Sequence, residues 1–270
     1  MKVSVVVPVY NNLQFTKMCI QDLLNQSKPC FEIILVDNGS ANDTIKFFSK
    51  YNELIIIRNE SNKGCAYSWN QGIRESKGEW IIILNNDVRL PDNWLENLIS
   101  YARKKNLDVV SPGMREGVLD YNFRNYSHEY TKLMHRVFRK WTPSGVCFAL
   151  RRNVIDKIGY FDENYKIGQY EDADFFRRCK IAKLKMGITG ACFIHHFGSS
   201  TQKHLQEIGA TGYALKNRNY HRRKWRLGFF KRNYERYKEQ ILSKYWSLSE
   251  YLFYKHSLLE KSDGEKISYY

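Results

Sequence analysis

A short apolar strand that ends in two amides and a carboxylate constrains this chain more than any other feature. Residues 81–87 read Ile-Ile-Ile-Leu-Asn-Asn-Asp, so a run long enough for a buried strand is followed at once by polar groups. Open α/β sheets place ligand-binding groups in this way, in the crevice outside the carboxyl ends of their strands. Asp87 offers the oxygen that Mg²⁺ or Mn²⁺ takes alongside the oxygens of a diphosphate. The stretch therefore predicts a nucleotide site in which a metal ion holds the diphosphate.

The first half of the chain alternates short apolar runs with longer stretches of helical spacing. Strands separated by helices of about ten residues pair in parallel, because each helix crosses back over the sheet. Such an order favours an α/β fold with a Rossmann-like, doubly wound, mostly parallel sheet and helices on both faces. The pattern predicts strands at Lys2–Val9, Phe31–Val36, Leu54–Ile57, Trp80–Leu84 and Leu107–Ser111, and helices at Leu13–Gln26, Asn42–Tyr51, Gly64–Glu75 and Pro91–Lys104.

The second half is less regular. Residues 115–140 have no clean period and are rich in Tyr, Arg and His. Such a segment is typical of a long, partly mobile loop, which could form the side of the site where an acceptor substrate binds. The remaining elements are predicted as strands at Gly145–Arg151 and Met186–Ile194, a helix at Glu171–Lys183, and helices beyond Gln206. The predicted domains are a compact unit at 1–202, with halves 1–112 and 113–202, and a basic, aromatic, helical tail at 203–270.

The positive charge of the chain is concentrated near its C-terminus. The net charge is +15 at pH 7, and residues 203–270 hold 15 Lys and Arg against 7 Asp and Glu, a net of +8. In residues 216–238, ten basic side chains are interleaved with aromatic ones, which suits an anionic membrane interface. Nucleic acid is the second candidate partner, since Arg and aromatic side chains also hold its backbone and bases. A helix packed on the domain with a solvated basic face is the third interpretation.

Other classes of protein are disfavoured by what the sequence lacks. No run reaches the roughly 18 apolar residues of a membrane-spanning helix. The chain enters a strand at Val3 without the layout of a signal peptide, so we expect cytoplasmic residence, with peripheral attachment to the inner face of a membrane through the basic tail. The six cysteines form no Cys-x-x-Cys pair, which disfavours a zinc site and favours small buried side chains.

Two polar groups of the first half stand where a nucleotide could bind. Asp37 closes the second strand and can accept hydrogen bonds from a nucleoside, although Asp-Asn-Gly-Ser is also an ordinary turn. Residues 62–64, Asn-Lys-Gly, open the helix that contains Asn70. The N–H groups at such a start suit a diphosphate, and the same residues also suit a plain turn with a solvated lysine.

Two polar groups of the second half could carry chemistry. Glu171 and Asp172 begin a helix, where acidic side chains are favoured by the helix dipole alone. A carboxylate at this position can also act as a general base toward an attacking hydroxyl. His195 and His196 end a strand, and each is either an ordinary structural histidine or a ligand for a metal such as Mn²⁺.

Taken in order, these motifs resemble those of the family 2 glycosyltransferases, which have the GT-A fold. The resemblance covers roughly residues 2–202 and is nearest in character to rhamnosyl- and galactofuranosyl-transferases that build bacterial surface glycans. The matching stretches are residues 6–12 (Val-Val-Pro-Val-Tyr-Asn-Asn), 36–40 (Val-Asp-Asn-Gly-Ser), 62–64, 84–87 (Leu-Asn-Asn-Asp), 159–163 (Gly-Tyr-Phe-Asp-Glu), 171–174 (Glu-Asp-Ala-Asp), and His195 with Ser200-Thr201.

The resemblance implies an inverting enzyme that uses a nucleotide-diphosphate sugar as donor and a glycan or lipid-linked glycan as acceptor. Asp172 matches the catalytic base, and Glu171 would orient it or contact the donor sugar. The donor-binding residues that the resemblance implies are Pro8, Tyr10, Asn12 and Asp37 for the nucleoside, Asn62, Gly64 and Asn70 for the ribose and diphosphate, and Asn86 as a further contact.

The resemblance also implies a divalent metal, Mn²⁺ or Mg²⁺. Asp87 matches the last carboxylate of the family's Asp-x-Asp motif, but Asn85 stands where many members have the first. Metal binding would therefore depend on Asp87 and His195 together. His195 is preferred to His196 because the family's histidine is followed five positions later by Ser, here Ser200.

Two other functions remain open from the sequence. The enzyme could glycosylate a modified base in DNA, which would use the basic tail and require the base to leave a duplex. Alternatively, the chain could be a non-catalytic, glycosyltransferase-like binding module. Asn85 is the feature that favours such a module, whereas Glu171, Asp172 and His195 argue against it.

Overall fold

One mixed sheet organises the computed structural model, which describes residues 2–26, 31–198, 212–264 and 267–269. The main strand order is β11-β10-β6-β8-β4-β1-β2-β3, and β9 pairs with β5, β6 and β7 beside that path. The neighbours β4, β1, β2 and β3 are parallel, and β8 joins them antiparallel. The strands are β1 Val3–Val9, β2 Phe31–Asp37, β3 Ile55–Arg58, β4 Trp80–Leu84, β5 Val88–Arg89, β6 Val109–Gly117, β7 Phe138–Arg139, β8 Cys147–Arg151, β9 Met186–His196, β10 Leu259–Ser262 and β11 Ile267–Tyr269.

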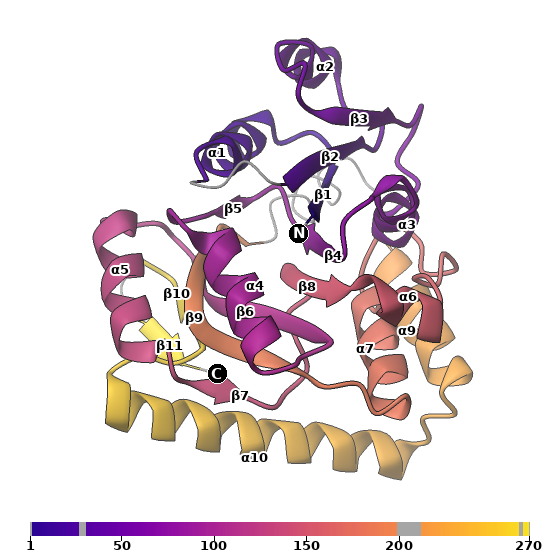
Figure 1. Cartoon of the computed structure of the whole chain (residues 1–270). Coiled ribbons are helices and arrows are strands. Elements are labelled where there is room, and N and C mark those ends of the chain that lie inside the picture. The colour runs from indigo at the N-terminus through magenta and orange to yellow at the C-terminus, as the bar shows by residue number, and fades with distance from the viewer. Residues whose placement is uncertain (1, 27–30, 199–211, 265–266, 270) are drawn as a thin grey trace.

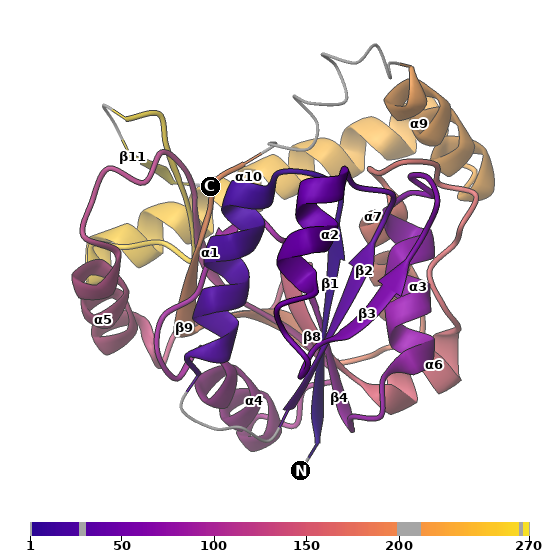
Figure 2. The same cartoon turned by 90° about the horizontal axis from the view of Figure 1, so that it is seen from above.

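Helices cover both faces of this sheet, as Figures 1 and 2 show. The predicted α/β class, the mostly parallel sheet and the two helical layers are therefore confirmed. The helices are α1 Leu13–Leu24, α2 Asn42–Phe48, α3 Cys65–Glu75, α4 Trp94–Lys104, α5 Phe123–Met134, α6 Arg152–Ile158, α7 Glu171–Ile181, α9 Tyr213–Lys224 and α10 Phe229–Tyr254.

Alternate residues of the central strands pack into two cores, one on each face. Val5 and Val7 of β1 belong to the core beneath α1, α2 and α4, whereas Val6 belongs to the core beneath α3, α6 and α7. The two-residue period of a strand and the sequence of β1, which is apolar except for Ser4, produce this arrangement. Polar residues are thereby confined to the strand ends, so Asn85, Asn86 and Asp87 emerge at the carboxyl end of β4.

The predicted irregular excursion at residues 115–140 contains a regular helix, α5, which corrects that expectation. Asn122 caps this helix by accepting a hydrogen bond from the backbone N–H of Asn125, at 3.1 Å. Its buried side consists of Ser127, Tyr130 and Met134. The helix escaped prediction because this buried side has too few apolar residues to give a clear helical period.

The C-terminal segment is helical at first, as predicted, but its end is not. Residues 259–262 form β10, which pairs in parallel with β6, and residues 267–269 form β11. The helical expectation is therefore wrong for these two stretches, because both strands extend the main sheet (Figure 1). A buried ion pair between Arg139 of β7 and Glu250 of α10, at 2.7 Å, fixes α10 to the domain. The proposed boundary near residue 203 lies outside the described residues.

Membrane-spanning helices are absent from the part of the chain that the structure describes, because none of its helices combines the required length with the required apolar content.

Candidate active site

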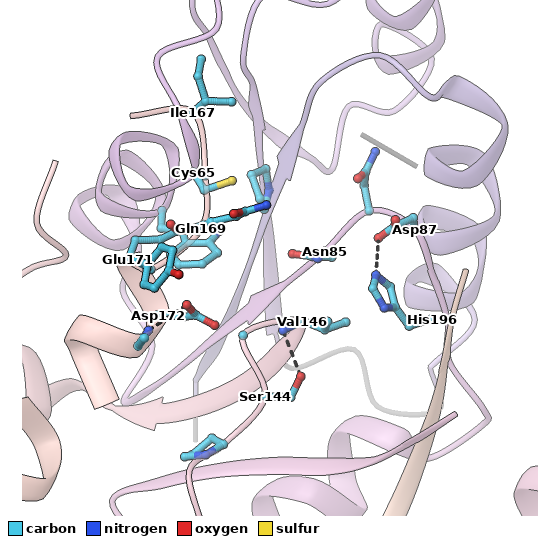
Figure 3. Close-up of a pocket in the computed structure, with 18 of the residues that line it drawn as sticks. Cys65, Asn85, Asp87, Ser144, Val146, Ile167, Gln169, Glu171, Asp172 and His196 are labelled. Atoms are coloured by element: carbon cyan, nitrogen blue, oxygen red, sulfur yellow. Dashed lines mark hydrogen bonds and ion pairs between the residues drawn. The ribbon is translucent and has the colours of Figure 1, made fainter. Parts of the chain in front are cut away.

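A cavity of about 730 Å³ opens at the carboxyl ends of β1 and β4. Figure 3 shows Glu171 and Asp172 on one side of it, Asp87 and His196 on the other, and Asn85 between them. Segments that are far apart in the sequence thus meet around one space, as the strand-end motifs predicted. The predicted site residues that line the cavity are Pro8, Tyr10, Asn62, Asn86, Asp87, Glu171 and Asp172.

Five predicted site residues lie outside this lining, and two of them have clear structural contacts. Asp37 is buried and accepts a hydrogen bond from the backbone N–H of Ser40 at 2.9 Å, which closes the turn after β2. Asn70 donates to the backbone carbonyl of Phe161 at 2.9 Å and accepts from the same residue's N–H at 3.0 Å. The remaining ones are Asn12, Gly64 and His195.

Gly64 sets the backbone at the start of α3. Its φ is +95°, and a Cβ at this position would lie 2.7 Å from the backbone nitrogen of Ile167. Only glycine accommodates this close approach without moving the neighbouring loop. Asn12, with φ of +53°, likewise occupies the left-handed conformation at the residue before α1. Both residues shape the cavity through the backbone.

The side of the cavity that contains Asp87 also contains His196. The structure thus places His196 where the sequence predicted His195 as the metal ligand. Strand β5 begins directly after Asp87 and pairs with the end of β9, so that Val88 lies opposite His196. This register brings Nε2 of His196 to 3.3 Å from Oδ1 of Asp87. Successive side chains of a strand point to opposite faces, so His195 points away.

His195 is completely buried among aromatic side chains behind the cavity. Its Nδ1 lies 2.9 Å from the hydroxyl of Tyr121, and its Nε2 has no hydrogen-bond partner among the described residues. Burial lowers its pKa to about 4, so the imidazole is neutral. The sequence spacing to Ser200 was the reason for choosing His195, and Ser200 and Thr201 lie outside the described residues.

The donor set at this wall fits a divalent cation. His196 has Asp87 at one ring nitrogen and Glu116 at the other, with Nδ1 3.1 Å from Oε2 of Glu116. Burial opposes protonation of His196, but hydrogen bonds and charges from both carboxylates outweigh it and raise the pKa to about 9. A histidine held by a carboxylate through its second nitrogen is a common ligand arrangement. No cluster of three or more His, Cys, Asp or Glu suited to metal occurs in the described ranges, so phosphate oxygens would supply other ligands.

The opposite wall is the first turn of α7. Tyr170, with φ of +76°, precedes the helix, and the N–H of Ala173 donates to Oδ1 of Asp172 at 2.7 Å. Asp172 is half-buried and faces the cavity, and Glu171 beside it is only 5% exposed. The helix start favours negative charge, so both carboxylates stand where a base can be held ready.

Glu171 is buried with an incomplete set of hydrogen bonds. Its Oε2 has no hydrogen-bond partner in the part of the chain that the structure describes. Burial and the adjacent charge of Asp172 raise the pKa of Glu171 to about 8, and burial also raises the pKa of Asp172. Such perturbed carboxyl groups in a cleft are typical of functional sites, because a fold built for stability alone would avoid them.

We expect Glu171→Gln to stabilise the protein in alkaline solution. The folded state holds the proton of Glu171 more tightly than the unfolded chain, so the free energy of unfolding falls as pH rises from 4.5 to about 8. Gln removes this loss, which is on the order of 2–4 kcal/mol. Thermal unfolding across this pH range measures the effect, with exposed Glu75→Gln as the control. Equal melting temperatures of Glu171→Gln and the wild-type protein at every pH would contradict it.

Sequence reasoning missed several residues of the cavity. Asn38 follows Asp37 and holds the Asn62 turn, donating to Oδ1 of Asn62 at 2.8 Å. The segments 141–146 and 167–170 form much of the remaining wall, together with Tyr213 of α9. The Trp-Thr-Pro-Ser-Gly sequence at 141–145 is a turn signal beside a strand and could have suggested a loop at the site. Near Tyr213 and Ile167 the sequence offers only the single glycines Gly212 and Gly168, which do not by themselves place a loop at the site.

Comparison with known proteins gives the family. The sequence model described as "Glycosyl transferase family 2" matches residues 4–159. This chain belongs to that family. It is 35% identical over 112 residues to the glycosyltransferase GlyG of Streptococcus pneumoniae serotype 4, covering 40% of this chain but only 37% of GlyG. It is also 25% identical over 220 residues to YwdF of Bacillus subtilis, an uncharacterised glycosyltransferase, covering 78% of this chain and 80% of YwdF.

Solved glycosyltransferases share the fold of this family 2 chain. S. aureus TarS residues 1–349 in complex with UDP align with a TM-score of 0.59 and 21% identity, covering 72% of this chain and 60% of TarS. GalNAc-T7 with UDP, GalNAc and Mn²⁺ aligns with a TM-score of 0.57 and 16% identity, covering 73% of this chain and 44% of that one. The predicted GT-A fold is therefore confirmed.

Proposed function

We propose that this protein transfers a sugar from a nucleotide-diphosphate sugar to a hydroxyl of a glycan or lipid-linked glycan, with inversion at the anomeric carbon. The observation that carries the proposal is the shared cavity, which holds a carboxylate–imidazole wall at Asp87 and His196 and a carboxylate pair at Glu171 and Asp172. The wall at Asp87 and His196 suits the departing diphosphate, and the wall at Glu171 and Asp172 suits the attacking hydroxyl. Family membership supports the same reaction.

The donor lies along the strand ends in this scheme. Asn38 and Asn62 hold the turn beside the nucleoside end, and Tyr10 lines the cavity near it. Asp87 and His196 would hold a divalent cation, which would supply charge stabilisation to the leaving diphosphate. Glu116 keeps the imidazole of His196 oriented through Nδ1.

The acceptor reacts at the α7 wall. Asp172 accepts the proton of the acceptor hydroxyl while the oxygen attacks the anomeric carbon from the side opposite the diphosphate. The new glycosidic bond forms as the bond to the diphosphate oxygen breaks, which inverts the configuration. Glu171 is too buried to meet a bulky acceptor, so its role is to hold the first turn of α7 and contact the donor sugar.

Donor binding can be tested before any acceptor is known. A ligand that binds the folded state raises its stability, by about 2.7 kcal/mol at a concentration one hundred times its Kd. Thermal shift with UDP, other nucleoside diphosphates and their sugars, each with and without Mn²⁺, is therefore the first experiment. UDP is the first probe because TarS and GalNAc-T7 were solved with it. If no nucleotide or nucleotide sugar shifts the melting temperature, the proposed function is wrong.

We expect Asp87→Ala to abolish Mn²⁺ dependence. The variant removes the carboxylate of the metal wall, so added Mn²⁺ should no longer increase the melting-temperature shift produced by the diphosphate. Asp92→Ala is the matched control, because the side chain of Asp92 is 64% exposed and outside the cavity. A wild-type protein that binds the diphosphate equally well in chelator would remove the metal from the scheme.

A further inference from the structure

We propose that α10 docks the protein on an anionic lipid surface through one exposed face. A row of apolar side chains on that face, the outer stripe, runs the length of the helix. Its members are spaced by three or four residues, which places them on one side of the helix. The sequence indicates an anionic partner for residues 216–238, and in the structure the contact surface overlaps the end of that range and continues along α10. The outer stripe consists of Phe230, Tyr234, Tyr237, Ile241, Tyr245, Leu248 and Leu252.

The polarity of α10 is the reverse of that of an ordinary surface helix. Its outer stripe is exposed by 56% to 87% at every position. The side that faces the domain holds polar contacts beside half-buried Leu242 and Trp246: Glu250 is buried against Arg139, and Glu235 pairs with Arg177 at 3.2 Å. A surface helix normally turns its apolar stripe toward the core and its charges toward water. Stability of this domain does not explain why seven large apolar side chains face outward.

A continuous apolar surface of this kind marks an interaction site. Figure 1 shows α10 lying along one edge of the molecule, so nothing on that side of the described chain covers the stripe. Three of the seven side chains are tyrosines and one is phenylalanine. Tyrosine has an apolar ring and a polar hydroxyl, which suits the boundary between acyl chains and lipid headgroups.

Charge decides between a lipid surface and a second copy of the chain. The exposed side chains of Lys231, Lys238 and Lys244 border the outer stripe. Of the carboxylates on α10, Glu235 and Glu250 form ion pairs with the domain, and the exposed Glu239 is outnumbered by these lysines and by the exposed Arg236. Two copies joined through this stripe would bring like charges together, whereas an anionic bilayer attracts all three lysines. The arrangement therefore fits a lipid headgroup layer.

Docking through α10 also orients the cavity. The helix is joined at one end to α9, which contributes Tyr213 to the cavity wall, and at the other to β10, which contributes Leu259. Both neighbours are fixed to the domain. Asn217 of α9 bonds the loop before α7, and β10 pairs with strand β6. A bilayer bound at α10 would hold the cavity in one orientation to the membrane, as a lipid-linked acceptor requires.

Vesicle flotation of the whole chain tests the proposal without any donor or acceptor. We expect the protein to float with vesicles of phosphatidylcholine and phosphatidylglycerol and to remain behind with phosphatidylcholine alone. The triple variant Ile241→Ser, Leu248→Ser and Leu252→Ser should lose flotation, because it removes all three aliphatic side chains of the outer stripe from an exposed surface. The matched control is Ile56→Ser, Val118→Ser and Ile181→Ser, whose side chains are exposed by 41% to 65% elsewhere. This control should float like the wild-type protein.

The lysines give a graded readout. Each basic side chain near an anionic bilayer contributes about fivefold in affinity, so Lys231→Gln, Lys238→Gln and Lys244→Gln together should weaken binding roughly a hundredfold. The UDP-induced thermal shift should stay unchanged in every α10 variant, which separates failure of docking from failure of the proposed reaction. Flotation that survives loss of the stripe overturns the proposal. A stripe-dependent dimer, or binding to duplex DNA, without any binding to anionic vesicles also overturns it.

Discussion

Replacing Asp172 by Asn should reduce sugar transfer by about 10²–10⁴-fold while leaving the nucleotide bound. Asn has nearly the same shape, and its amide oxygen can still accept the N–H of Ala173, now 2.7 Å from Oδ1 of Asp172. It cannot take a proton from the acceptor hydroxyl. The loss should therefore fall on kcat, and the donor Kd should change little. Single-turnover transfer and donor titration together measure both quantities.

The exposed Asp156→Asn on α6 is the control for this change, since it removes a carboxylate from the surface. It should transfer at the wild-type rate. Asp172→Asn turning over within a few-fold of the wild type would mean that another group is the base.

Substitution of Gly145 tests the role of Asp172 as the base without changing Asp172 itself. A Cβ added at Gly145 would lie 2.2 Å from Oδ2 of Asp172, so Gly145→Ala forces that carboxyl group to rotate away. A side chain yields more readily than a backbone, and the fold should tolerate the change. A displacement of about 1 Å at a reacting group can cost a hundredfold in rate. Transfer should therefore fall while the melting temperature stays near that of the wild type.

The elements that the sequence predicted well are those whose pattern is local. Residues 81–87 predicted both a buried strand and its polar end, because the apolar run is followed directly by two amides and a carboxylate. The strand β10 could not be predicted in this way. Leu259–Ser262 reads Leu-Glu-Lys-Ser, with a single apolar residue, and only its pairing with Met114–Gly117 makes it a strand. That pairing depends on a contact across more than a hundred residues of chain.

The candidate site shows the same division. Asp87, Glu171 and Asp172 were predicted because carboxylates at element ends have a recognisable chemistry. The choice between His195 and His196 depends on strand register. Successive side chains of a strand point to opposite faces, so a shift of one residue would exchange the two histidines. The register is set by the pairing of β5 with β9, and the two-residue strand β5 has no sequence pattern of its own.

Replacing Asn217 by Ala should lower both stability and turnover, although this residue lies in the segment that the sequence assigned to a separate tail. Asn217 is 2% exposed on α9, and its side chain bonds the backbone of the loop before α7. Its Nδ2 donates to the carbonyls of Lys166 at 2.9 Å, Gly168 at 2.8 Å and Gln169 at 3.2 Å, and its Oδ1 accepts from the N–H of Lys166 at 3.1 Å.

This loop needs such a clamp because its backbone is strained. Ile167, Gln169 and Tyr170 have φ values of +64°, +74° and +76°, in the left-handed region that non-glycine residues rarely adopt. Each costs on the order of 1 kcal/mol or more, and a β-branched residue is especially unfavourable there. The loop also lines the cavity and leads directly into Glu171, so its relaxation would move the carboxylate pair. We expect a loss of about 3 kcal/mol in unfolding free energy from the unsatisfied buried carbonyls.

The decisive measurement is turnover well below the melting temperature, where the variant is folded. If Asn217 positions the loop, kcat should fall roughly tenfold to a hundredfold there, with donor Kd little changed. The exposed Asn219→Ala on the same helix controls for loss of an amide from α9 and should match the wild type. Adding Ile167→Gly to Asn217→Ala should recover part of the turnover, because glycine adopts this φ without strain. A variant that melts early but transfers normally would show that Asn217 stabilises the fold without setting the active site.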